Sequence, residues 1–173
     1  ISQPKSDGQL RVGGRMAIAL QIDTASGPLT LAAVHYESES TPESRAIQTD
    51  RLLARLSDTY GPGPAVIGGD LNTAALLEGG RTGADALADP ATTEPCFDRY
   101  AAAGFDWRGA NTGAFTTRAA PGKPVRYPLR ILDWLFTRDV APRAPKVWPA
   151  LSDSGDYLSD HELLTVEISV PAA

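Results

Sequence analysis

The chain has two histidines, and each lies where an apolar run meets a polar segment. His35 follows the run Leu-Ala-Ala-Val, and His161 ends the tripeptide Ser-Asp-His. Acidic residues recur in similar places, because Asp70 follows a short apolar run and Asp133 interrupts the run Ile-Leu-Asp-Trp-Leu-Phe. Carboxylates and imidazoles are costly to bury unless they are paired, hydrogen-bonded or bound to a metal ion. Their placement therefore indicates a site for acid, base or metal chemistry at or near strand ends.

The elements that must position these residues are strands, recognised as short apolar or alternating runs bounded by turn-forming residues. The first two runs are separated by a segment that contains Ser-Gly-Pro, which favours a hairpin with His35 at the far end of its second strand. Asp70 and Asn72 directly follow the third run, and Asp133 lies within the fourth. The expected strands cover residues 15–22, 29–36, 65–69, 131–137 and 162–170.

Helical signals are fewer. The sequence Thr-Pro-Glu at 41–43 supplies an N-cap, a proline at the first helical position and an acid in the first turn, so we expect a helix that ends near residue 56 or 57. A short second helix is expected over residues 94–103. The segments 73–94 and 105–129 show no convincing periodicity, and we expect them to be mostly loop.

Composition limits the classes of protein. With 42% apolar and 21% charged residues, the 173-residue chain is typical of one soluble globular domain. Its net charge of −5 excludes an overall basic field that would drive non-specific binding to long polyanions. Cys96 is the single cysteine and cannot form an internal disulfide, and no Cys and His spacing resembles a zinc site. No apolar run approaches the length of a membrane span, so we expect no membrane insertion.

Arg45 lies in the first expected helix. At 3.6 residues per turn it shares the apolar side that carries Leu52, Leu53 and Leu56. Because a buried charge needs partners, we expect Arg45 to be buried beneath its helix with hydrogen-bonding groups around it. Two roles are open for it, a structural clamp and a substrate contact.

Taken together, the motifs resemble those of the endonuclease/exonuclease/phosphatase superfamily, the DNase I-like metal-dependent phosphoesterases. The shared pattern is a strand that ends in His35, a Gly-Asp-Leu-Asn turn at 69–72, an apolar strand that bears Asp133, and a terminal Ser-Asp-His that ends at His161. Each motif alone is a weak signal, but their order along the chain is specific. The resemblance spans roughly residues 15–170.

The resemblance implies an α+β fold that is part of a four-layer α/β/β/α sandwich of the DNase I-like type, with N-terminal strands missing. Residues 1–173 would then form a single partial phosphoesterase domain. Family members also use an Asn and a metal-binding Glu from their first strands, and neither motif occurs here. The first residue is not Met, so we expect a fragment whose exposed sheet is covered by a separate or cleaved N-terminal chain or by a second copy.

The resemblance also implies roles for the site residues, because phosphoester hydrolysis needs an activated water, a cation and a donor to the phosphoryl oxygens. Asp70 would orient or deprotonate the attacking water, and Asn72 would donate to a phosphoryl oxygen. Asp133 would fix the tautomer of His161 and stabilise its charged form. His35 would contact the phosphate as a donor or acid.

A divalent cation is the cofactor implied by the resemblance. Asp70 and Asp160 are expected on the metal side, and oxygen ligands favour Mg²⁺ or Mn²⁺ over zinc. Carboxylates that converge with Asp133 would repel one another unless a cation or a proton offsets them. Arginines near the Asp133 strand could add positive potential over a phosphate, although solvated surface is the favoured role for any one of them. The substrate-binding candidates are Asn72, Arg45 and Arg130.

The expected function is divalent-metal-dependent hydrolysis of a phosphoester by activated water, as a nuclease, phosphodiesterase or phosphatase. DNA, RNA, lipid head groups and small phosphoesters stay open as substrates. Because hard cations rely on several oxygen ligands, we expect this chain alone to be weakly active or inactive. The alternative is a non-catalytic binding or scaffold module that kept the fold but lost its metal-binding Glu.

Overall fold

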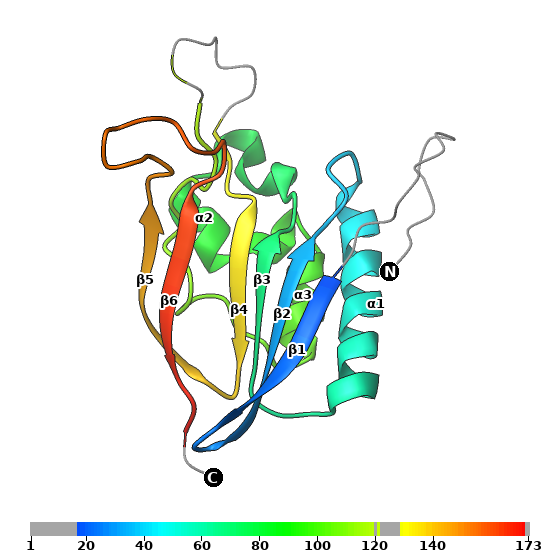
Figure 1. Cartoon of the computed structure of the whole chain (residues 1–173). Coiled ribbons are helices and arrows are strands. Elements are labelled where there is room, and N and C mark those ends of the chain that lie inside the picture. Colours follow the sequence, from blue (N-terminus) through cyan, green and yellow to red (C-terminus); the bar gives the residue numbers. More distant parts are fainter. Residues whose placement is uncertain (1–16, 120, 122–128, 172–173) are drawn as a thin grey trace, which may run out of the picture.

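The computed structural model describes residues 17–119, 121 and 129–171, and Figure 1 shows their arrangement. The strands are β1 (Ala17–Thr24), β2 (Gly27–His35), β3 (Ala65–Asp70), β4 (Asp133–Arg138), β5 (Ala141–Trp148) and β6 (Leu163–Ser169). The α-helices are α1 (Pro42–Tyr60), α2 (Gly83–Ala88) and α3 (Cys96–Ala102), and short 3-10 segments cover Ala74–Gly80 and Pro90–Thr92.

The strands form a four-stranded mixed sheet of order β1-β2-β3-β4 and an antiparallel ribbon of β5 and β6. β2 and β3 are parallel, and α1 is the crossover that a parallel pair requires. The two outer pairs of the sheet are antiparallel. β6 contacts β4, so the ribbon lies beside the sheet (Figure 1).

The core lies between the sheet and the helices. Ile67, Trp134 and Phe136 are fully buried on the face of the sheet that α1 and α3 cover. Phe97 of α3 packs edge-on against Trp134 with ring centroids 4.8 Å apart, and Tyr100 stacks on Phe136 at 3.8 Å. This aromatic packing fixes β3 and β4 against the helices and thereby positions the acidic residues that these strands carry.

The opposite face of the sheet is open over β1. Ile18, Leu20 and Ile22 alternate on that face, and their exposed fractions are 67%, 47% and 41%. Three exposed apolar side chains on the same face of one strand form an apolar patch that is unusual on the surface of a folded domain.

The helix α1 begins as expected and ends later than expected. Thr41 caps it by accepting a hydrogen bond from the backbone N–H of Ser44 at 3.2 Å. The helix runs on to Tyr60 because the first strong helix breaker is Gly61, which adopts a positive φ of 73° and donates its N–H to the carbonyl of Ser57. The expected end near residue 57 was therefore about one turn short.

Arg45 is buried beneath α1, as its helical phase predicted. Its guanidinium donates to both carboxylate oxygens of Glu94, with Nε to Oε2 at 2.8 Å and Nη2 to Oε1 at 2.6 Å. The Arg45 and Glu94 side chains are 2% and 0% exposed. Nη1 donates to the carbonyl of Ser40. The bidentate pair ties α1 to the segment before α3, which favours the structural clamp over the substrate contact.

Residues 73–94 contain more helix than the sequence indicated. The segment folds into two 3-10 stretches and α2, and α2 begins with a capping box in which Thr82 and Asp85 exchange hydrogen bonds. The Thr-x-x-Asp spacing is typical of a helix N-terminus, but the six residues of α2 are too few to show a helical period in the sequence.

The strand β5 was not predicted. It holds Pro142 and Pro145, and proline cannot donate to a strand ladder, so the run did not look like a strand. The structure accommodates the prolines in a two-stranded ribbon whose register shifts between Arg143 and Lys146, with Ala144 at a positive φ of 50°. The expected strand residues 15–16 and loop residues 120 and 122–128 lie outside the described residues.

We predict that Arg45→Ala lowers the free energy of unfolding by about 3–5 kcal/mol, because it leaves the Glu94 carboxylate buried without its cation. Urea unfolding monitored by circular dichroism measures the change. The double variant Arg45→Met/Glu94→Leu should recover much of the loss, since it removes both buried charges.

The matched control is Arg99→Ala. Arg99 pairs with Asp50 at 3.5 Å on the surface, where both side chains are about half exposed, so its loss should change stability by less than about 0.5 kcal/mol. Equal losses for the two alanine variants would contradict the clamp role of Arg45.

Candidate functional site

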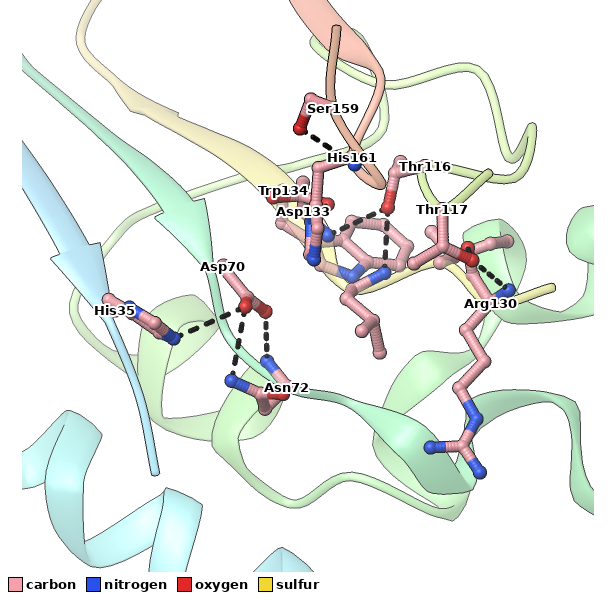
Figure 2. Close-up of polar contacts among 12 residues, drawn as sticks. His35, Asp70, Asn72, Thr116, Thr117, Arg130, Asp133, Trp134, Ser159 and His161 are labelled. Carbon is pink, nitrogen blue, oxygen red and sulfur yellow. Dashed lines mark hydrogen bonds and ion pairs between the residues drawn. The ribbon is translucent and has the colours of Figure 1, made fainter. Parts of the chain in front are cut away.

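Strand register gathers three of the expected site residues. His35 of β2 is the register partner of Asp70 in β3, and Asp70 is the partner of Asp133 in β4. Paired residues on neighbouring strands point to the same face of a sheet, so these side chains form one row across three strands, here called the polar row (Figure 2). The row lies on the face opposite α1 and α3.

Glycine shapes the strand end that presents Asp70. Gly69 has a φ of +145°, and a Cβ at this position would lie 1.9 Å from the carbonyl oxygen of Val34. Only glycine allows β3 to approach β2 so closely, and the preceding Gly68 also faces a side chain, because a Cβ there would lie 2.6 Å from Cδ2 of Leu135. The packing of the strand that carries the carboxylate therefore requires glycine at position 69.

Asn72 holds the carboxylate of Asp70. Its backbone N–H donates to Oδ1 at 2.8 Å and its side-chain Nδ2 donates to Oδ2 at 3.1 Å. Nδ2 also donates to the carbonyl of Tyr36 at 3.0 Å, so both amide protons of Asn72 are engaged. Asn72 has a positive φ of 53°, a conformation that Asn tolerates better than most residues. In this arrangement Asn72 orients Asp70.

His35 lies next to the same carboxylate. Its Nε2 is 3.4 Å from Oδ2 of Asp70, and its side chain is about half exposed (Figure 2). Burial raises the pKa of Asp70, whereas the Asn72 N–H and the two histidines lower it, and the net direction is upward. Asp70 is therefore a stronger base than a solvated carboxylate.

His161 forms the second pair of the site. Its Nδ1 is 2.8 Å from Oδ2 of Asp133, and its backbone N–H donates to Oγ of Ser159 at 3.0 Å. The hydrogen bond that His161 donates to Asp133 raises the pKa of His161 to about 9, against a smaller lowering by burial. The negative charges of Asp133, Asp70 and Asp160 act in the same upward direction. At neutral pH His161 is therefore an imidazolium, with Nδ1 directed at Asp133.

The other sequence candidates form none of the site's side-chain contacts described above, although the charge of Asp160 acts on His161. Asp160 is exposed, and its main-chain carbonyl accepts a hydrogen bond from the N–H of Arg118. Arg45 lies beneath α1 in its pair with Glu94. The main chain of Arg130 donates to Oγ1 of Thr117 at 2.7 Å, while its side chain extends away from the Asp133–His161 pair in Figure 2.

Sequence reasoning missed one residue at the site. Oγ1 of Thr116 accepts a hydrogen bond from the backbone N–H of Asp133 at 3.0 Å, although Thr116 lies in a segment expected to be irregular (Figure 2). No sequence motif identifies Thr116, because its contacts depend on how the segment 105–119 packs against β4.

A divalent cation fits these side chains only incompletely. The part of the chain that the structure describes holds no group of three or more His, Cys, Asp or Glu side chains placed to bind a metal ion. Both oxygens of Asp70 accept from Asn72, and Oδ2 of Asp133 is engaged by His161. The described residues therefore do not complete a site for Mg²⁺ or Mn²⁺ by themselves.

Of the described helices, none is long and apolar enough to cross a bilayer.

We predict that His161 titrates with a pKa near 9 in the folded chain, well above its usual value of 6.5, and that Asp133→Asn moves the pKa back toward 6.5. An NMR titration of the imidazole resonances measures both values. A pKa near 6.5 in the unmodified protein would contradict the charged pair.

The same shift predicts a pH dependence of stability. Because the folded pKa lies above the unfolded one, protonated His161 stabilises the fold, fully so below pH 6.5 and progressively less as pH rises through about 9. His161→Gln should flatten this part of the stability profile.

Comparison with known proteins identifies the fold. No protein-family model and no curated protein sequence matches the chain. Solved structures do match. An endonuclease/exonuclease/phosphatase from Bacteroides vulgatus has a TM-score of 0.65 at 19% identity, over 97% of this chain and 61% of its own. TDP2 of D. rerio, complexed with a single-strand DNA product, has a TM-score of 0.60 at 20% identity, over 90% of this chain and 62% of its own.

The human Nocturnin catalytic domain with bound sulfate has a TM-score of 0.62 at 19% identity, over 92% of this chain and 54% of its own. The chain thus spans about three fifths of the length of the first structures that it resembles. At these identities the likeness concerns the fold, and it confirms the expected α+β class of the DNase I-like type. The chain therefore has a large part of the fold of the endonuclease/exonuclease/phosphatase proteins, and the polar row and the His161–Asp133 pair lie on that part.

Proposed function

We propose that this chain carries the acid, base and donor groups of a site that hydrolyses phosphoesters with activated water. The observation that carries the proposal is the convergence of His35 and Asp70 on one side of the row with the Asp133–His161 pair on the other. A solved structure of the same fold supports it, since TDP2 of D. rerio is described in complex with a single-strand DNA product.

His161 has the properties of a donor to a phosphoryl oxygen. Asp133 holds Nδ1, so Nε2 is the ring nitrogen directed elsewhere, and a pKa of about 9 keeps its proton in place at neutral pH. About one third of the His161 side chain is exposed, so a substrate can reach it. A charged donor that is already oriented stabilises the negative charge that develops on the phosphoryl group.

Asp70 has the properties of the base. Its oxygens are fixed by Asn72, and its raised pKa increases its affinity for a proton from an attacking water. His35 lies 3.4 Å from Asp70 on the exposed side, where its ring can donate to a second phosphoryl oxygen. The base and the two donors thus lie at the ends of the adjacent strands β2 and β3 and in the segment before β6.

Dependence on Mg²⁺ or Mn²⁺ is a further part of the proposal. Asp70 and Asp160 offer carboxylate oxygens, which are ligands that these ions prefer. Since the described residues do not complete a cation site, such an ion would need additional ligands.

We predict slow hydrolysis of bis-p-nitrophenyl phosphate that increases with added Mg²⁺ or Mn²⁺ and falls on chelation. His161→Ala and Asp70→Asn should each reduce the rate by about 100- to 10,000-fold, because each removes an acid or base group. Asp153→Asn is the matched control, since it removes an exposed carboxylate from the 150–160 segment outside the polar row.

The non-catalytic alternative predicts a different result. A scaffold that kept the fold without the chemistry would show no hydrolysis above background, or the same rate in the wild-type chain and in His161→Ala. Either outcome would contradict the catalytic proposal.

We also propose that polypeptide outside these 173 residues covers the open face of β1. The support is the exposure of Ile18, Leu20 and Ile22 and the additional two fifths of chain in the matched structures. The chain on its own should therefore bind an apolar dye such as ANS at this face, and Leu20→Glu should reduce the binding. Ile47→Glu, at an isolated exposed position on α1, is the control.

Self-association of the chain that Leu20→Glu abolishes would identify a second copy as the covering partner instead. A soluble monomer that binds no apolar dye would contradict the proposal.

A further inference from the structure

Thr116 is a junction between the two segments that carry the Asp133–His161 pair. Its side chain is 2% exposed, and its Oγ1 accepts hydrogen bonds from the backbone N–H groups of Leu132 at 2.9 Å and Asp133 at 3.0 Å (Figure 2). Its own N–H donates to the carbonyl of Arg130, and its carbonyl accepts from the N–H of Glu162, both at 2.8 Å. Every polar atom of Thr116 is therefore used to join the start of β4 to the residue after His161.

The neighbours of Thr116 strengthen this junction. Thr117 forms an isolated antiparallel bridge with His161, and the N–H of Arg118 donates to the carbonyl of Asp160 at 2.8 Å. The Arg118 side chain pairs with Glu162 at 2.7 Å. Residues 116–118 thus run alongside the His161 segment on one side, while Thr116 holds the β4 segment on the other.

We propose that Thr116 is a positioning residue for the Asp133–His161 pair. The inference deepens the proposed function and rests on it for its catalytic consequence. The Thr116 hydroxyl fixes the backbone of Asp133, and the Thr116 carbonyl fixes the backbone next to His161. A single residue thereby sets the separation at which the Asp133 carboxylate meets the imidazole, and it does so without contact with a substrate.

The hydroxyl is the group on which the role depends. Valine matches the shape of threonine but cannot accept the two backbone protons, so Thr116→Val leaves the Leu132 and Asp133 N–H groups buried without an acceptor. Relief of that penalty requires the start of β4 to move, which changes the position of the Asp133 carboxylate. Serine retains the hydroxyl, so Thr116→Ser should keep the arrangement.

Two readouts test the inference in the whole chain. In Thr116→Val we expect kcat for bis-p-nitrophenyl phosphate to fall by about 10- to 100-fold with little change in KM, the range seen when a group that orients a site residue is lost. The NMR signal of the His161 Nδ1 proton, which the hydrogen bond to Asp133 protects, should broaden or disappear. Thr116→Ser should restore both.

Thr49→Val is the matched control. Thr49 is fully buried, and its hydroxyl bonds to Tyr36 and to the carbonyl of Arg45 beneath α1, away from the pair. Its loss should lower stability but leave the His161 signal and kcat unchanged, which separates positioning from a general loss of packing.

The inference is overturned if folded Thr116→Val keeps the His161 signal and kcat, or if Thr116→Ser is as damaging as Thr116→Val. If Thr116→Val does not fold, amide hydrogen exchange in the wild-type chain tests the contact. Exchange of the Leu132 and Asp133 N–H groups at the rate of exposed amides would refute it. Absence of His161-dependent hydrolysis in the wild type would instead refute the proposed function, while the NMR signal would still test the positioning.

Discussion

The structure depends on the register between β2, β3 and β4. This register places His35, Asp70 and Asp133 in one row on one face of the sheet. Because side chains alternate between faces, a slip of one residue in any strand would turn a member of the row into the aromatic core. The core prevents this, since Trp134 and Phe136 on the other face of β4 are fully buried against α3. The hydrophobic packing that stabilises the fold is therefore also what aligns the polar groups.

Charges in and beneath the site are arranged as pairs. His161 is held by Asp133, Asp70 is held by Asn72 with His35 nearby, and Arg45 is neutralised by Glu94 under α1. The Arg45–Glu94 pair is closed to solvent, which suits a structural role. The other two are partly exposed, and each keeps a titratable group at the surface with a raised pKa. Differences in burial thus separate the clamp from the groups that are able to exchange protons.

The sequence was a good guide where a residue's position follows from local pattern. The placement of His35, Asp70 and Asp133 within strands or at strand ends, and the burial of Arg45, followed from apolar runs and helical phase. It was a poor guide where tertiary contacts decide. The prolines of β5 concealed a strand whose partner is β6, and Thr116 gains its role only when an irregular segment returns to β4. The partner of Arg45, Glu94, was equally invisible, because the two residues belong to different elements.

The pH dependence of phosphodiester hydrolysis distinguishes the roles of Asp70 and His161. If Asp70 acts as base and protonated His161 as donor, kcat/KM should rise as the Asp70 carboxylate ionises and fall as pH passes about 9, where His161 loses its proton. Asp133→Asn should move the alkaline limb to lower pH, because the imidazolium loses its carboxylate partner. An alkaline limb that Asp133→Asn leaves in place would show that the pair on this sheet edge does not supply the proton donor.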